Sequence, residues 1–121
     1  MNETFIRTAQ LLGDQGFSRL SSSAVAVFGL GGVGSHCAEA LTRSGVGTLF
    51  LIDSDTVAPS NINRQSIALL STVGQKKTDV MKEKIADINP ECSVFTSSAF
   101  VLPENLQEVF SSCPVKPDYI I

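Results

Sequence analysis

The hydrophobic residues of this chain form short apolar runs that alternate with segments of helical periodicity. Apolar residues run without strict alternation over 24–30 and again over 48–52, a pattern typical of central parallel strands covered on both faces. Glycines at both ends bound a helix expected over about 32–44. This strand–helix–strand order predicts a βαβ unit in a parallel sheet.

The same alternation continues after the second strand. Val80, Met81, Ile85 and Ile88 recur at helical spacing and are expected to be buried. The elements expected after residue 52 are a helix over 75–89, a third strand over 93–100, a short helix over 103–110 and a fourth strand over 118–121. Because doubly wound sheets commonly order their strands 3-2-1-4, the fourth strand is expected beside the first.

The first 22 residues are expected to form a helical arm before the sheet. Phe5, Ala9 and Leu12 share one helical face, Gly13 is a stop signal, and a second helical turn is expected over 16–20. We therefore predict a single α/β domain over residues 1–121. Its fold is Rossmann-like, with three αβα layers, a mainly parallel sheet and the arm 1–22 in front.

A glycine-rich turn follows the first apolar run. Gly29, Gly31 and Gly34 form G-x-G-x-x-G, and Asp53 follows at the end of the second run, roughly 20 residues on, as in dinucleotide-binding βαβ units. Gly31 allows a phosphate to approach the backbone, and Gly34 allows tight packing of the helix on the strand. A phosphate there meets the free amides and the positive dipole end of the helix. The turn therefore predicts nucleotide binding.

The residues after Asp53 favour ATP over NAD. A triphosphate has more charge than the diphosphate of NAD and needs cations that stabilise the departing pyrophosphate. SNINRQ, residues 60–65, supplies a guanidinium among neutral donors, and Lys77 follows. The alternative interpretation of residues 60–65 is a polar surface loop without a role in phosphate binding. The candidate nucleotide-binding residues are Gly29, Gly31, Gly32, Gly34, Asp53, Asp55, Asn61, Arg64, Gln65 and Lys77.

Composition limits the class of protein. The formal net charge is −3 and the pI is near 5.0, so the chain lacks the basic stripe of proteins that bind nucleic-acid backbones. Cys37, Cys92 and Cys113 are odd in number and form no C-x-x-C pair, which favours a reduced, cytoplasmic protein. We expect no membrane span. His36 is interpreted as a partly exposed helical histidine rather than a catalytic one.

Six motifs together resemble one family: IRTAQLLG, VFGLGGVGS, LIDSD, SNINRQ, STVGQKK and DINPE. They are similar to the ubiquitin-activating-enzyme-like superfamily of ThiF/MoeB-type adenylating proteins, and most similar to its tRNA threonylcarbamoyladenosine dehydratase branch. The resemblance implies ATP and magnesium as cofactors. It also implies that a substrate carboxylate attacks the α-phosphate, after which a ring closes on the modified adenosine of a tRNA.

The resemblance also assigns roles to individual residues. Asp53 falls at the ribose-binding acid, while Asn61, Arg64 and Lys77 fall at phosphate-contacting positions. Arg64 and Lys77 are therefore the expected catalytic residues. Arg7 matches an arginine that reaches into the ATP site of a partner subunit, which implies a homodimer and adds Arg7 to the catalytic set. Relatives often have another arginine where this chain has Thr4.

The resemblance further implies that the chain is the N-terminal portion of a longer domain. In the family, the magnesium-ligating aspartate follows the fourth strand, so no metal ligand is assigned among residues 1–121. We expect this portion alone to be inactive and tRNA to be held mainly by the missing part. Three alternatives stay open: adenylation of the C-terminus of a sulfur-carrier or ubiquitin-like protein, an NAD-binding oxidoreductase, and a non-catalytic nucleotide-binding module.

Overall fold

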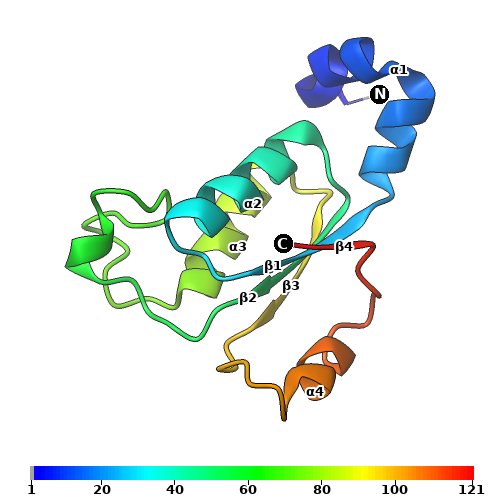
Figure 1. Ribbon diagram of the computed structural model, residues 1–121. Coiled ribbons are helices and arrows are strands. Elements are labelled where there is room, and N and C mark those ends of the chain that lie inside the picture. Colours follow the sequence, from blue (N-terminus) through cyan, green and yellow to red (C-terminus); the bar gives the residue numbers. More distant parts are fainter. Residues whose placement is uncertain (1) are drawn as a thin grey trace.

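The structure, a computed structural model, describes residues 2–121, so Met1 of the expected arm lies outside it. Four parallel strands form one sheet in the order β3-β2-β1-β4, which confirms the predicted order (Figure 1). The strands are β1 Ala24–Phe28, β2 Thr48–Ile52, β3 Ser93–Ser97 and β4 Tyr119–Ile120. The helices are α1 Ile6–Ser21, α2 Gly32–Ser44, α3 Lys77–Ile88 and α4 Leu106–Ser111, with 3₁₀ turns η1 Glu3–Phe5 and η2 Pro59–Asn61.

Helices cover both faces of the sheet and make three layers, as the sequence predicts (Figure 1). Successive side chains of a strand point to opposite faces. Val25 and Val27 of β1 therefore belong to the core on the side of α2 and α3, with Ala38, Met81 and Ile85. On the other face, Ala26, Phe50 and Ile52 pack with Val109 and Cys113 from the region of α4. Since both faces are covered, the central strands are apolar without alternation.

Several elements are shorter than the sequence pattern indicates. β1 ends at Phe28 rather than residue 30, because Gly29 has φ +88° and leaves the extended conformation. β3 ends at Ser97 rather than residue 100. α3 begins at Lys77 rather than residue 75, because Lys76 still pairs with Thr56 in an isolated bridge. The last helix runs from 106 to 111 rather than from 103 to 110.

The N-terminal arm is bent at Gly13, as predicted, where φ is 77° and ψ is 166°. The Phe5 and Phe17 rings lie 5.8 Å apart between centroids and meet the domain at Gly45. Of the three residues predicted to share one helical face, Phe5 and Ala9 are buried, whereas Leu12 is 46% exposed. It lies next to the bend, beyond the two rings that contact the domain.

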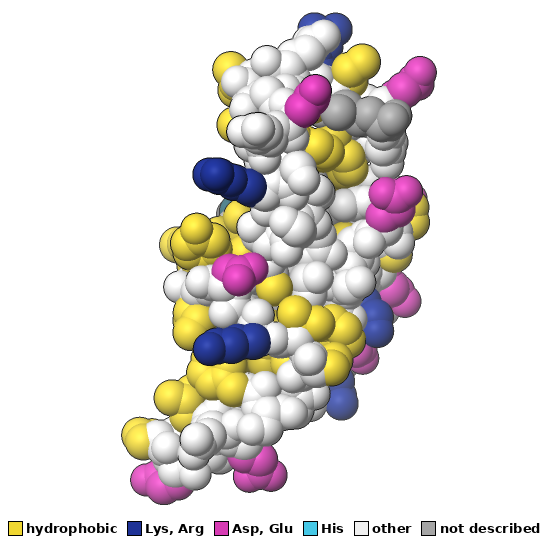
Figure 2. Space-filling model, turned by 90° about the vertical axis from the view of Figure 1, so that its right-hand side faces the viewer, with side chains coloured by type: hydrophobic (Ala, Val, Ile, Leu, Met, Phe, Trp, Pro, Cys, Tyr) yellow, Lys and Arg dark blue, Asp and Glu magenta, His cyan; other side chains and the backbone are white. Residues whose placement is uncertain are grey.

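Exposed apolar side chains gather at the β4 edge. Figure 2 views the molecule from this side and shows hydrophobic side chains between the arm and α4. The exposed large apolar residues of α4, β4 and the segments beside them are Leu106, Val115, Tyr119, Ile120 and Ile121. In the part of the chain that the structure describes, no helix combines the length and hydrophobicity needed to cross a membrane.

Gly34 is where α2 comes closest to the end of β1. A Cβ atom on Gly34 would lie 1.8 Å from the Gly29 carbonyl oxygen, well inside van der Waals contact. The sequence-based role of Gly34, tight packing of the helix on the strand, is confirmed. This contact fixes the first turn of α2 directly behind the glycine-rich turn.

Replacing Gly34 with Ala should lower the free energy of unfolding by about 1–3 kcal/mol, because the added methyl group forces α2 away from the strand. Urea denaturation measures this difference. Gly31→Ala is the matched control, since the nearest heavy atom to a Cβ there is Gln65 Nε2 at 3.9 Å. Equal losses in the two variants would contradict the packing role.

Candidate nucleotide-binding site

The glycine-rich turn lies at the carboxyl ends of the parallel strands, where doubly wound sheets bind their ligands. Gly29 leaves β1 and donates its N–H to Ile52 O at 2.7 Å, so the turn stays joined to β2. Gly31 is the N-cap of α2 and has no side chain that could satisfy the first amides of the helix. These amides and the helix dipole point toward the turn and favour an anion there.

Asp53 joins the end of β2 to the glycine-rich turn. Its Oδ2 accepts a hydrogen bond from Leu30 N at 2.6 Å, and its Oδ1 accepts one from Asp55 N at 2.8 Å. A carboxylate can accept about four hydrogen bonds in all. Asp53 therefore holds the turn and can still accept from a hydroxyl group, as a ribose-binding residue must.

A cleft of about 300 Å³ opens beside Asp53. Phe28, Ile52 and Phe100 give it apolar walls, and Asp53 and Asp55 give it an acidic rim. This combination suits a flat base attached to a sugar. Phe28 and Phe100 are not among the residues predicted for the site. The signal that could have found them is position: Phe28 directly precedes Gly29 of the glycine-rich turn, and Phe100 is the last residue of the expected third strand.

The loop after β2 returns to the glycine-rich turn. A Cβ atom on Gly32 would lie 3.6 Å from Arg64 Cγ, so the stem of Arg64 crosses the start of α2. Gln65 is only 6% exposed, and its Nε2 is the nearest heavy atom to the Cβ position of Gly31. Both predicted residues thus lie beside the expected phosphate position.

Lys77 is the first residue of α3 and lies beside Asp55, in the segment after β2. Lys77 is 5% exposed, and its Nζ is 3.9 Å from Oδ2 of the largely exposed Asp55. Lys77 N also donates to Asp55 O at 3.1 Å. A buried ammonium group with one distant carboxylate partner has capacity for a further anion. Asn61 uses its Oδ1 to accept from Ala58 N, which folds the loop.

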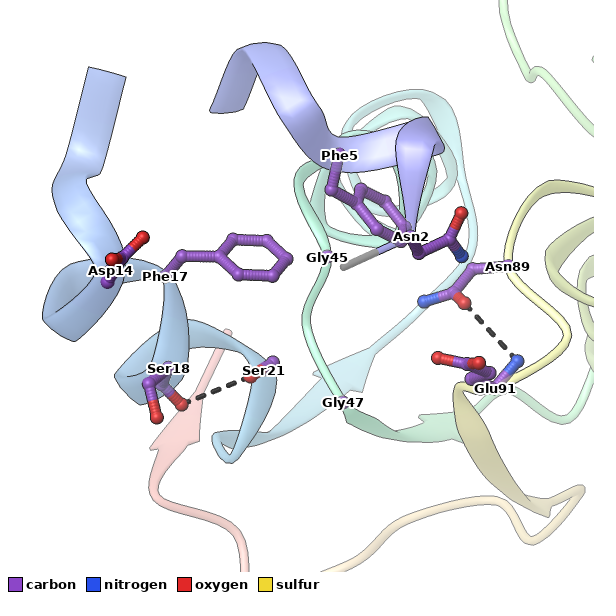
Figure 3. A pocket seen from close by; sticks show the side chains of 10 residues that line it. All are labelled: Asn2, Phe5, Asp14, Phe17, Ser18, Ser21, Gly45, Gly47, Asn89 and Glu91. Atoms are coloured by element: carbon purple, nitrogen blue, oxygen red, sulfur yellow. Dashed lines mark hydrogen bonds between the residues drawn. The ribbon is translucent and has the colours of Figure 1, made fainter. Parts of the chain in front are cut away.

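The structure does not bring Arg7 to this site within one chain. Arg7 is exposed on α1, and the arm lies at the opposite end of the sheet, beyond the amino ends of β1 and β2 (Figure 1). A second cavity of about 450 Å³ lies there, with the Phe5 and Phe17 rings facing Gly45 (Figure 3). Its described lining includes Asp14 and Glu91 but no Lys or Arg, so it does not suit phosphates.

Residues 2–121 offer little support for metal binding, for disulfide formation or for catalysis by Cys92. No group of three or more His, Cys, Asp or Glu residues lies together there to hold a metal ion. Cys37, Cys92 and Cys113 form no disulfide in this range. Burial raises the pKa of the Cys92 thiol to about 11, so this residue stays protonated at neutral pH and is a poor nucleophile.

Comparison with known proteins adds independent observations. The model of the ThiF family matches residues 5–121. A Bacillus subtilis tRNA threonylcarbamoyladenosine dehydratase is 52% identical over 91% of this chain and 43% of its own length. An Aspergillus niger adenylyltransferase and sulfurtransferase, uba4, is 37% identical over 84% of this chain and 21% of its own.

A solved structure is similar to this chain over nearly its whole length. The Escherichia coli dehydratase TcdA in complex with ATP superposes with a TM-score of 0.92 at 42% identity, covering 98% of this chain and 47% of that one. The chain therefore spans less than half the length of the relatives it matches.

Replacing Lys77 with Met should weaken binding of a nucleoside triphosphate by roughly 10- to 100-fold, the loss expected for a charge-assisted hydrogen bond. The melting temperature should stay the same or rise, since Met fills similar volume without a buried charge. Calorimetric titration and thermal denaturation measure the two effects. Lys76→Met, at the exposed neighbouring residue, is the control. Unchanged affinity in the Lys77 variant would exclude Lys77 as an anion ligand.

Proposed function

Because this chain belongs to the ThiF family, we propose that it is the ATP-binding portion of an enzyme that adenylates a carboxylate. The observation that supports this most directly is a set of four features in the segments that follow the carboxyl ends of β1 and β2. The features are the open backbone at Gly31, the Asp53 carboxylate, the Arg64 stem over α2 and the buried Lys77. The solved TcdA structure that superposes on this chain was determined with ATP.

Each of these residues has a distinct task in the proposed reaction. The cleft with apolar walls takes the adenine, and Asp53 accepts from the ribose hydroxyls. The α2 amides, Arg64 and Lys77 bind the phosphates, with Gln65 beside them. A substrate carboxylate attacks the α-phosphorus, the bond to the β-phosphate breaks, and pyrophosphate leaves as an acyl-adenylate forms. Arg64 and Lys77 stabilise the negative charge on the departing pyrophosphate.

The proposed substrate is a threonylcarbamoyl group on a tRNA adenosine, whose activated carboxyl closes a ring as AMP leaves. The 52% identical Bacillus subtilis relative bears the name of that activity. Since this chain has a net charge of −3, a tRNA would be bound mainly by surfaces outside it. The second candidate is adenylation of a carrier-protein C-terminus, favoured by the similarity to the Aspergillus niger protein.

The proposal includes a homodimer in which Arg7 acts on the partner's site. Arg7 is exposed and remote from the site of its own chain, as an arginine that acts in trans must be. Magnesium and a cytoplasmic location belong to the proposal as well. Residues 2–121 contain no group of three or more His, Cys, Asp or Glu residues that could hold the ion.

Titration with ATP and with NAD distinguishes the proposed site from a dinucleotide site. A ligand that binds only the folded state raises the melting temperature. We expect ATP to stabilise the chain and NAD to have little effect, because Arg64 and Lys77 need the additional phosphate charge. Stabilisation by NAD alone would overturn the proposal in favour of an oxidoreductase.

Gly31→Val should abolish the ATP-dependent rise in melting temperature while the unliganded melting temperature changes little. The branched side chain fills the space where phosphate meets backbone, and outside the adjacent residues the nearest heavy atom to its Cβ position is Gln65 Nε2 at 3.9 Å. Val33→Thr is the matched β-branched control, since Val33 is 84% exposed on the same helix. Normal ATP stabilisation of the Gly31 variant would contradict the phosphate position.

A further inference from the structure

The tripeptide Arg64–Ser66 lies beside the proposed phosphate site, yet two of its side chains do not anchor it. Gln65 Oε1 and Ser66 Oγ are the buried side-chain polar atoms without a hydrogen-bond partner among residues 2–121. The Arg64 guanidinium bonds back to its own loop, through Nη1 to Ser60 O at 3.2 Å and to Asn63 Oδ1 at 2.8 Å. These contacts shape the loop but do not join it to α2.

Side chains of α2 and α3 make that connection instead. His36 Nε2 lies 3.0 Å from Arg64 O, and Ser35 Oγ accepts from Ser66 N at 3.2 Å. Lys84 Nζ donates to Ser66 O at 3.3 Å. Lys84 is itself held by Glu39 of α2, and this hydrogen bond lowers the pKa of the Glu39 carboxyl. Three side chains thus hold three backbone atoms of the tripeptide.

We propose that His36 is a positioning residue for Arg64. The inference rests on the proposed function, because it takes Arg64 as a phosphate ligand. A carbonyl oxygen only accepts hydrogen bonds, so Nε2 of His36 must donate. By fixing Arg64 O to the first turn of α2, His36 keeps the Arg64 stem over Gly32, where the helix amides face the phosphates. His36 acts through Arg64 and need not touch the nucleotide itself.

The position of His36 separates this role from a role in folding. His36 is exposed and belongs to neither hydrophobic core cluster of the described residues. Its loss removes one hydrogen bond at the surface. Ser35 and Lys84 still hold Ser66, so the loop stays folded while Arg64 gains freedom to leave α2. We therefore expect an effect on ATP affinity without a matching effect on stability.

A double-mutant cycle on this chain tests the inference. His36→Ala should weaken ATP binding by roughly three- to tenfold, and Arg64→Ala by roughly tenfold or more, in calorimetric titrations. The double variant should bind ATP no more weakly than Arg64→Ala alone. Val33→Ala on the same helical turn is the control and should bind ATP normally. Independent, multiplicative losses in the double variant would overturn the inference, as would normal affinity in His36→Ala.

Two further measurements separate positioning from a general structural effect. His36→Gln should restore most of the affinity, because its amide Nε2–H can donate near the place of the ring Nε2–H. Nitrogen NMR of the wild-type His36 ring should show a proton on Nε2. A neutral ring protonated at Nδ1 alone would overturn the inference. This measurement uses only the wild-type chain, so it tests the inference even if a variant fails to fold. Absence of ATP binding by the wild-type chain would overturn the proposed function together with this inference, whereas the other adverse results overturn the inference alone.

Discussion

The approach of α2 to the end of β1 is the constraint from which the rest of the site follows. At Gly34 the helix backbone comes so near the Gly29 carbonyl that no side chain fits between them. The free amides at the start of α2 are therefore fixed next to the turn that leaves β1. Asp53 then ties the same turn to β2 through Leu30 N. Two strands and one helix thus share a single junction, and a displaced helix would carry the anion-binding amides away from it.

The two ends of the sheet differ in chemistry. At the carboxyl ends, Arg64 crosses the start of α2, Lys77 begins α3, and apolar walls offer a place for a base. At the amino ends, the arm contributes two aromatic rings and Asp14, and the segment before β3 contributes Glu91, to the cavity beside Gly45. Phosphates are attracted to the first end and repelled by the second. The cleft at the carboxyl ends is itself lined by Asp53 and Asp55, so we expect it to take the base and sugar, with the phosphates beside it at the α2 amides and Arg64.

The distinction between an ATP site and an NAD site depends on residues outside the glycine-rich motif. The glycines and Asp53 occur in both kinds of site. The loop after β2 adds Arg64 and Gln65 next to the turn, and α3 adds a lysine that is buried beside an exposed carboxylate. Burial of Lys77 with one distant partner is costly unless an anion binds. The similarity to a TcdA structure determined with ATP agrees with this interpretation.

The sequence alone determined the limits of α2 and β2 and the glycine-rich turn, because these depend on local periodicity and on residues with special backbone freedom. The strand order followed from the βαβ pattern, because doubly wound sheets share a common order. Most of the candidate residues could also be named, since charged and amide side chains in a loop after a buried strand are conspicuous. The ends of β1 and β3, the exposure of Leu12, the aromatic walls of the cleft and the contact of His36 with Arg64 could not. These features arise between segments far apart in the chain, and periodicity within one segment has no information about the segment it will meet. Only the tertiary structure decided them: the loop after β2 returns to α2, for example, and brings residues 28 positions apart within hydrogen-bonding distance.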